Sequence, residues 1–318
     1  MKTIQITQSG GVDQLQITET ELPTPQANEV LVGVQAISVN PVDFKVRQHE
    51  NLLSLIYGPQ RPAILGWDIA GTVVAVGKAV TQFQVNDRVF GMVNFPGAGN
   101  AYAEYVVAPA DQLAHVPESI DFNAAAATTL AALTALQALE GRINSGDRVL
   151  IHAGSGGVGH FAIQMAKAMG ADVITTASAK NKDLVLALGA DEHIDYRSQQ
   201  FETVVSDVDF VLDMFNGEIL LNSVKVTKTG GTAIPLPTPE FSDVALELAQ
   251  AKKASVAQSM VQSNGQDMQR LGEMLASGTV KPHVSATFPF EDMDQAHLQL
   301  ESGRTVGKVV VTVNKDSK

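Results

Sequence analysis

Three glycines in the middle of the chain have a spacing that serves dinucleotide binding. Gly154, Gly156 and Gly159 match the pattern G-x-G-x-x-G, and they stand between the apolar run 149–153 and an amphipathic run. One glycine of such a turn permits a tight bend, the second lets a pyrophosphate approach the backbone, and the third allows close packing of helix on strand. The first N–H groups of the following helix would face the phosphates. The expected contacts are Gly154, Ser155, Gly156, Gly157, Val158 and Gly159.

The residue at the end of the second strand of such a site indicates which dinucleotide binds. Sites for NAD place Asp or Glu there to bind the ribose, whereas sites for NADP avoid that charge and supply a cation. In this chain the position falls at Ala177, and Ser178, Lys180 and Lys182 follow within reach of a 2'-phosphate. A solvated helix start is the alternative interpretation of the lysines, although cations are unfavourable beside the positive end of a helix dipole. The pattern predicts NADPH, with either lysine as the phosphate ligand.

Composition narrows the class of protein. The chain has 318 residues, a formal net charge of −12 and no cysteine. Nucleic-acid backbones are bound by clustered Lys and Arg, which this sequence does not show, and no apolar run reaches the ~20 residues of a membrane helix. Because residues 1–8 alternate and lack the apolar core of a secretion signal, we expect a cytoplasmic protein. Without cysteine, and with seven histidines that show no paired spacing, no metal site is expected.

Alternating strands and helices must position the glycine turn. Apolar strands are expected at 149–153, 173–177, 193–195, 208–213 and 232–236, with a last one within 255–261, and helices lie between them. This alternation predicts a doubly wound parallel sheet. The last strand is apolar and falls at an edge of the sheet, so we expect a second copy of the chain to cover it.

A β-rich unit precedes this sheet. Strands are expected at 15–20, 29–38, 68–76, 88–93 and 103–107, and a small barrel is the natural way to close them. Glycine and proline predict loops at 48–61 and 94–100. Helical patterns at 268–276 and 294–301 and a strand at 308–313 end the chain, and we expect that strand to return to the first unit. The predicted domains are 1–119 with 263–318, and 120–262.

Eight short motifs, taken together in their order and spacing, resemble one family. They are Asn40-Pro-Val-Asp43, Gly66-Trp-Asp-Ile-Ala-Gly71, Val85-Asn-Asp-Arg-Val89, Ala103-Glu-Tyr-Val106, Leu133-Thr-Ala135, His152-Ala-Gly-Ser-Gly-Gly-Val-Gly159, Leu188-Gly-Ala-Asp191 and Gly307-Lys-Val-Val310. The chain resembles the zinc-independent quinone oxidoreductase branch of the medium-chain dehydrogenase/reductase superfamily, the branch that includes zeta-crystallin. The resemblance implies an α/β fold, with an N-terminal chaperonin-10-like (GroES-like) β-barrel, a Rossmann doubly wound parallel sheet, and the active site in the cleft between them. It also implies a homodimer.

The resemblance assigns further contacts to the dinucleotide. It places Thr134 near the nicotinamide and Tyr196 on the side of the adenosine phosphate, although a plain loop tyrosine would also explain Tyr196. The ends of the fourth and fifth strands would lie along the dinucleotide. Those positions are Asp213, Met214, Pro235 and Leu236.

The implied reaction is hydride transfer from NADPH to a quinone or to the β-carbon of an enone. It needs orientation, stabilisation of a developing oxyanion and a proton, but no metal. Asn40 matches the family's orienting asparagine, with a turn asparagine before a proline as the alternative. Asp43 and Tyr57 are candidates for the substrate side, with Tyr57 as a proton donor. Zinc alcohol dehydrogenases place Gly-His-Glu where this chain has Gly66-Trp67-Asp68, so zinc is not expected, and Asp68 should lie in a buried ion pair.

Two other functions fit parts of the pattern. Short-chain dehydrogenases also bind NADPH on a Rossmann sheet, but they use Tyr-x-x-x-Lys, which none of the four tyrosines matches. An NADPH-binding redox sensor or structural protein with little turnover stays open, because the sequence shows no obvious general acid.

Overall fold

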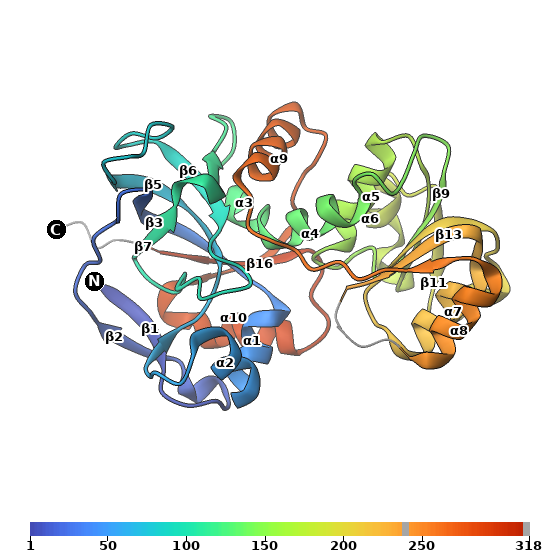
Figure 1. Ribbon diagram of the computed structural model, residues 1–318, viewed down its shortest axis with the longest axis horizontal. Coiled ribbons are helices and arrows are strands. Elements are labelled where there is room, and N and C mark those ends of the chain that lie inside the picture. Colours follow the sequence, from blue (N-terminus) through green and yellow to red (C-terminus); the bar gives the residue numbers. More distant parts are fainter. Residues whose placement is uncertain (237–241, 314–318) are drawn as a thin grey trace. The chain divides into compact units, whose positions relative to one another are not determined.

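The computed structural model describes residues 1–236 and 242–313. The chain forms two compact units, shown in Figure 1. Unit 1 comprises Met1–Leu133 and Gln262–Lys318, and unit 2 comprises Thr134–Val261. Unit 1 is therefore built from two separate segments of the chain, and unit 2 is the segment that joins them.

Strands make up most of unit 1. The larger sheet has the order β15-β16-β3-β5-β6-β8, with β7 also paired to β3, and a smaller sheet has the order β2-β1-β4. The strands are β1 (Lys2–Ile6), β2 (Gln16–Glu19), β3 (Glu29–Val39), β4 (Ala63–Ile64), β5 (Asp68–Val76), β6 (Arg88–Met92), β7 (Tyr105–Pro109), β8 (Leu113–His115), β15 (Val284–Pro289) and β16 (Lys308–Thr312). β16 runs antiparallel to β3, with Val309 opposite Val39. The expectation that the last strand returns to the first unit is therefore confirmed.

Five helices of the described residues lie wholly within unit 1. They are α1 (Pro41–Gln48), α2 (Glu50–Tyr57), α3 (Phe122–Ala127), α9 (Gly265–Ser277) and α10 (Met293–Glu301). The prediction of a loop over 48–61 is wrong, because α2 occupies most of this range and buries Leu53. α1 begins where the extended Asn40 is followed by a proline, whose fixed φ suits the first helical position. The carboxylate of Asp43 accepts the backbone N–H of Asn40, which holds this helix start in place.

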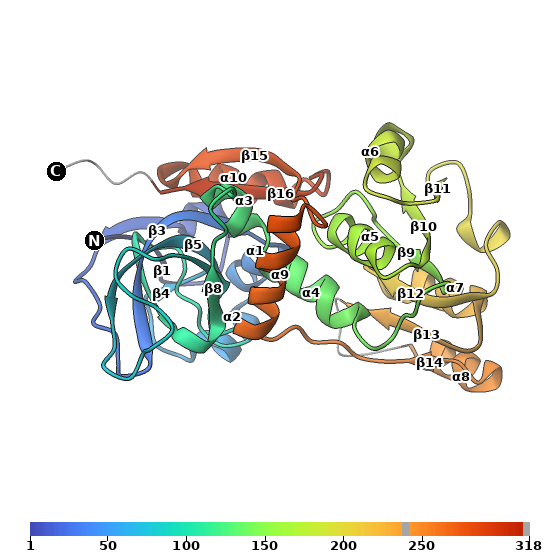
Figure 2. The same ribbon diagram turned by 90° about the horizontal axis from the view of Figure 1, so that it is seen from above.

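Unit 2 is a parallel sheet with helices on both faces. Its strands follow the order β11-β10-β9-β12-β13-β14, and every pair is parallel. They are β9 (Arg148–Ile151), β10 (Asp172–Ala177), β11 (Glu192–Asp195), β12 (Val208–Asp213), β13 (Thr227–Pro235) and β14 (Ser255–Val256). Figure 2 shows α5 (Gly159–Ala168) and α6 (Lys182–Ala187) on one side of this sheet, and α7 (Gly217–Val226) and α8 (Asp243–Lys252) on the other. The doubly wound parallel sheet is confirmed.

The end of unit 1 differs from the expected domain boundary. The second domain is expected to begin at residue 120, whereas unit 1 continues to Leu133. α3 packs against β3 and β5, which places it with unit 1. α4 (Leu130–Leu139) begins in unit 1 and continues into unit 2.

The core of unit 2 explains why its strands have nearly continuous apolar sequences. Leu150, Ile174, Val211 and Ala233 come from four neighbouring strands and share one buried cluster with Leu220 of α7. A parallel sheet covered on both faces has no solvated side, so polar residues do not alternate along its strands. Polar groups are therefore left to the strand ends.

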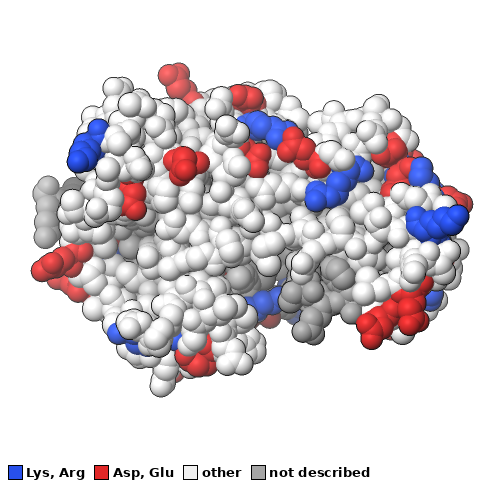
Figure 3. All heavy atoms as spheres, in the orientation of Figure 1, with Lys and Arg blue, Asp and Glu red and all other residues white. Residues whose placement is uncertain are grey.

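Charged side chains are mixed on the surface that Figure 3 draws. On the face drawn in Figure 3, Lys and Arg are scattered among Asp and Glu and form no broad patch among the described residues. No helix within 1–236 or 242–313 has the length and apolar character that crossing a bilayer requires.

Candidate functional site

The glycine turn of unit 2 lies between the end of β9 and the start of α5. A Cβ atom on Gly154 would lie 2.0 Å from Oγ1 of Thr175, and one on Gly159 would lie 2.2 Å from the carbonyl oxygen of Ala153. Neither position has room for a side chain. These two glycines therefore provide the close packing of helix and strand that the spacing predicts.

Gly156 has a different environment. A Cβ atom there would lie 3.1 Å from the carbonyl oxygen of Ala153 and no nearer to any other atom, and its neighbours Ser155, Gly157 and Val158 are only partly buried. The turn thus has an open side next to the start of α5, where the first N–H groups of a helix have no partner within the helix. These residues fit the phosphates of a dinucleotide.

The segment after β10 is bonded to the glycine turn. β10 ends at Ala177, as the sequence predicts, and the side-chain amide of Asn181 donates to Oγ of Ser155 at 2.8 Å. Ser178 is buried, whereas Lys180 and Lys182 are exposed. Asn181 is not among the residues expected at this site, although an amide between two lysines at this strand end is a recognisable polar contact. The segment 178–182 and the glycine turn therefore lie side by side.

The ends of β12 and β13 meet at the same edge of the sheet. Asp213 lies opposite Pro235, and the backbone N–H of Leu236 donates to the carbonyl oxygen of Asp213 at 2.9 Å. The carboxylate of Asp213 accepts the backbone N–H of Phe215 at 2.7 Å. Burial raises the pKa of Asp213. Its side chain is therefore used to hold its own loop, which leaves the half-buried Met214 as the partly accessible residue there.

His152 links three elements behind the glycine turn. Its Nδ1 lies 3.0 Å from the hydroxyl of Thr176, and its Nε2 lies 3.1 Å from that of Ser223. Burial lowers the pKa of His152 to about 3, so the ring is neutral near pH 7. This arrangement gives His152 a structural role between these elements. Of the other expected contacts, Thr134 is nearly buried in α4 and Tyr196 follows β11 with 57% of its surface exposed.

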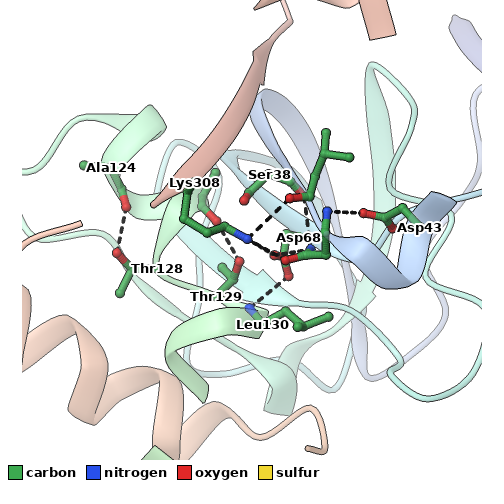
Figure 4. A network of polar contacts seen from close by, with 11 residues as sticks. Ser38, Asp43, Asp68, Ala124, Thr128, Thr129, Leu130 and Lys308 are labelled. Atoms are coloured by element: carbon green, nitrogen blue, oxygen red, sulfur yellow. Dashed lines mark hydrogen bonds and ion pairs between the residues drawn. The ribbon is translucent and has the colours of Figure 1, made fainter. Parts of the chain in front are cut away.

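Unit 1 contains a buried network around Asn40, drawn in Figure 4. The ammonium of Lys308 donates to the side-chain oxygen of Asn40, and the Asn40 amide donates to Oδ2 of Asp68 at 2.8 Å. Nζ of Lys308 lies 4.0 Å from the same Asp68 oxygen, so the expected buried ion pair of Asp68 is confirmed. Oδ1 of Asp68 accepts the N–H of Leu130, at the start of α4. Burial raises the pKa of Asp68 and lowers that of Lys308, and their mutual attraction opposes both shifts.

Both parts of the chain match family models of known proteins. Residues 26–118 match the family model of the alcohol dehydrogenase GroES-like domain, and residues 188–311 match that of the zinc-binding dehydrogenases. The 2-methylene-furan-3-one reductase of Solanum lycopersicum is 34% identical over 98% of this chain and 79% of its own length. This chain belongs to the medium-chain dehydrogenase/reductase superfamily. Like the members it matches, it is an oxidoreductase with a GroES-like and a Rossmann-like part.

Solved structures of superfamily members have the same fold. The quinone oxidoreductase of Coxiella burnetii is 35% identical, with a TM-score of 0.92 over 99% of both chains. The Escherichia coli quinone oxidoreductase complexed with NADPH is 28% identical, with a TM-score of 0.87 over 98% of this chain and 100% of that one.

The position where zinc-dependent members of the superfamily carry a ligand histidine is occupied by Trp67 in this chain. The indole is fully buried and its Nε1 donates to the carbonyl oxygen of Gly97 at 2.6 Å. Over 1–236 and 242–313, no three His, Asp or Glu side chains lie together as a metal site would require. The carboxylate of Asp68, the residue after Trp67, pairs with Lys308 and accepts hydrogen bonds from Asn40 and Leu130.

The remaining candidates, Asp43 and Tyr57, lie on α1 and at the end of α2 in unit 1, and the Tyr57 ring lies 6.4 Å from that of Trp67. Oδ2 of Asp43 accepts the N–H of Asn40 at 2.5 Å, and burial raises the pKa of Asp43 to about 8. Burial and the charge of Asp43 raise the pKa of Tyr57 well above its ordinary value. Tyr57 also lines a hollow of about 440 Å³ within unit 1. Both side chains are thus buried acids that hold protons near pH 7.

Proposed function

We propose that this chain transfers hydride from NADPH to a quinone or an α,β-unsaturated carbonyl compound, without zinc. One observation carries the cofactor assignment: the bond from Asn181 to Ser155 holds the segment with Ser178, Lys180 and Lys182 beside the open glycine turn. No carboxylate ends β10 to bind a ribose hydroxyl, and two cations stand where a 2'-phosphate would be placed.

Each of these residues has a proposed contact with the cofactor. Gly156 and the start of α5 would hold the pyrophosphate, and the lysines would hold the 2'-phosphate. The remaining proposed contacts are Thr134, Tyr196, Asp213, Met214, Pro235 and Leu236, of which Asp213 acts by shaping its loop. Bound NADPH would supply the hydride.

The absence of zinc is supported by the residues of unit 1. Trp67 cannot coordinate a metal, no cysteine is available, and Asp68 is held by an ammonium and two N–H donors. Without a metal, the acceptor must be oriented and protonated by side chains. We propose Asn40 as the orienting group, with its amide fixed by Lys308 and Asp68, and Tyr57 as the proton donor.

Binding and turnover test this function separately. The purified protein should bind NADPH at least tenfold more tightly than NADH in a fluorescence titration. It should then oxidise NADPH in the presence of ortho-quinones or of short enones. Equal affinity for NADH would contradict the cofactor assignment. Tight NADPH binding without turnover over a broad panel of acceptors would instead indicate a redox sensor or structural protein.

We further propose a two-fold homodimer. β14 ends the sheet of unit 2, pairs with β13 alone among the described strands, and is followed by Met260, which is 58% exposed. An unpaired edge beside an apolar side chain is suited to pairing with the same edge of a second copy.

A further inference from the structure

Two acidic side chains of unit 1 have buried oxygens without a hydrogen-bond partner among the described residues. They are Oδ1 of Asp43, on α1, and the hydroxyl of Tyr57, at the end of α2. Buried polar atoms are nearly always paired, so two unpaired ones in the same region call for an explanation. The Tyr57 ring lies 6.4 Å from that of Trp67, and the neighbouring Asp68 is bonded to Asn40, whose N–H is accepted by Asp43. The two groups therefore lie in one region of unit 1, where an ionised Asp43 raises the pKa of Tyr57.

A second tyrosine beside Asp43 has its hydrogen bonds fixed by a chain of buried groups. NH1 of Arg47 lies 3.3 Å from Nδ1 of His297, and the hydroxyl of Tyr102 lies 2.8 Å from Nε2 of the same ring. Arginine only donates, so Nδ1 accepts and we assign the ring proton to Nε2. That proton is donated to the Tyr102 oxygen. Burial and the charge of Arg47 lower the pKa of His297 to about 3, so the ring has no second proton.

The Tyr102 proton is therefore free to point toward Asp43, whose pKa its hydrogen bond lowers. Asp68 of β5 raises the pKa of Asp43, and Lys308 of β16 lowers it. Arg47, on the same helix as Asp43, is paired to Glu301 at 2.5 Å. Burial outweighs the favourable contacts, so the carboxyl holds a proton at neutral pH. Of the two tyrosines near Asp43, Tyr102 is engaged by His297 and by Asp43 itself, whereas the Tyr57 hydroxyl has no side-chain partner among the described residues and interacts only with the backbone of Gly99.

We propose that Asp43 is the internal proton store of the reaction and refills Tyr57 after that residue has protonated the acceptor. This inference rests on the proposed function. Once hydride has added to the β-carbon of an enone, the Tyr57 O–H bond breaks and its proton bonds to the α-carbon. The Asp43 O–H bond then breaks, and its proton restores the Tyr57 hydroxyl, directly or over one water. The Asp43 carboxylate takes a proton from water as the product leaves.

The direction of each transfer follows from the acidities. A carboxylic acid of pKa about 8 gives its proton readily to the phenolate of Tyr57, whose pKa is raised well above its ordinary value. Whether the reaction needs a stored proton depends on the acceptor. An enone needs a proton placed at carbon, whereas the reduced oxygens of a quinone exchange protons with water without help. The store therefore matters for enones, which makes them the acceptor class that this chemistry fits.

The experiment compares two tyrosines and two acceptors. For an enone, kcat of the wild-type enzyme should fall as pH rises above about 8. Tyr57→Phe should lower kcat about 100-fold, within the range of a general acid. Asp43→Asn should lower it about tenfold at pH 7 and abolish the fall at high pH. Tyr102→Phe, the matched control, should lose less than threefold at pH 7 and keep a fall, moved to higher pH because Asp43 loses a hydrogen bond that lowers its pKa. With a quinone, Asp43→Asn should change kcat less than twofold.

A measurement without turnover keeps the proposal testable if a variant does not fold. The infrared carbonyl band of a protonated carboxyl should disappear from the unliganded wild-type protein with a midpoint near pH 8. A wild-type protein without such a band, or an Asp43→Asn enzyme that keeps the high-pH fall, would overturn the proposal. Equal losses in the two tyrosine variants would also overturn it. If NADPH is consumed with neither acceptor, the proposed function fails, and the infrared titration still decides whether Asp43 stores a proton.

Discussion

The ammonium of Lys308 donates a hydrogen bond to the side-chain oxygen of Asn40, 268 residues earlier in the chain. The amide nitrogen of Asn40 faces the carboxylate of Asp68 instead. A cation on one side and an anion on the other leave only one orientation of the amide in which both contacts are favourable. Asn40 is therefore a rigid polar group, fixed by two buried charges.

Removing the cation of this network should destabilise unit 1 strongly. Lys308→Met leaves Asp68 buried without its counter-charge, and breaking a buried pair in this way costs about 3–5 kcal/mol. The free energy of unfolding in urea measures the loss. Lys167→Met removes the cation of an exposed pair with Asp191 and should change stability little. Equal effects of the two substitutions would contradict the view that Lys308 and Asp68 are both charged.

The stability of unit 1 should depend on the protonation of Asp43. Its pKa is raised from 3.8 to about 8, so the folded state binds a proton that the unfolded state releases between these values. The stabilisation is complete below pH 4 and is lost as pH rises toward 8, and a shift of this size corresponds to several kcal/mol. Melting temperatures from pH 5 to 8 should fall in the wild type and stay flatter in Asp43→Asn. Parallel curves would show that Asp43 is ionised throughout.

Alanine substitutions at two glycines of the turn should affect the stability of unit 2 and the binding of NADPH differently. In Gly159→Ala the new Cβ would meet the backbone oxygen of Ala153, so unit 2 should lose stability or fail to fold. In Gly156→Ala the nearest atom is 3.1 Å away, so the melting temperature should change by a few degrees at most, while a methyl group on the open side weakens NADPH binding. Thermal melts and NADPH titrations of both variants check this. A Gly156→Ala protein that binds NADPH normally would remove this glycine from the phosphate site.

The choice between NADPH and NADH should depend on Lys180 or Lys182. A charged hydrogen bond to the 2'-phosphate contributes about 1.5–3 kcal/mol, so alanine at the lysine that makes it should weaken NADPH binding roughly tenfold to a hundredfold. NADH affinity should not change, because NADH has no phosphate there. Lys167→Ala is the control, because its partner Asp191 lies just before β11 and accepts the N–H of Val173 at the start of β10, away from the segment 178–182. Unchanged NADPH affinity in both variants would assign the lysines to the solvated helix start.

The proposed dimer should show in the mass of the protein. Light scattering at micromolar concentration should give twice the chain mass of 33.7 kDa. Met260→Lys places a charge beside the edge strand β14 and should shift the protein toward monomer without loss of its melting temperature. A monomeric wild type would contradict the pairing of edges.

Local patterns predicted unit 2 well. The parallel sheet could be recognised from apolar runs of strand length between helical runs, and the roles of Gly154 and Gly159 followed from the spacing alone. Ala177 was placed at its strand end because β10 is bounded by clear signals on both sides. The prediction that Asp68 lies in a buried ion pair was confirmed as well, because a carboxylate in an apolar strand needs a partner.

What the sequence did not reveal depends on contacts between distant residues. Lys308 could not be recognised as the partner of Asp68, since a lysine near the chain end gives no sign of burial. The chain from Arg47 through His297 to Tyr102 joins α1, α10 and the segment before β7, and no spacing connects them. α2 was missed for a different reason: Gly58 and Pro59 favoured a loop, although the apolar positions at 52, 53, 55 and 56 suit a helix.

Because Lys308 lies in β16, the two units can complete their folding only in a certain order during translation. As the chain leaves the ribosome, Asn40 and Asp68 emerge before unit 2, but the ammonium that pairs with Asp68 comes from β16, the last strand of the described residues. Unit 2 is encoded wholly between the two segments of unit 1, so all of its residues are available first. During translation the first segment of unit 1 must therefore wait, with Asp68 lacking its counter-charge, while unit 2 can already be complete.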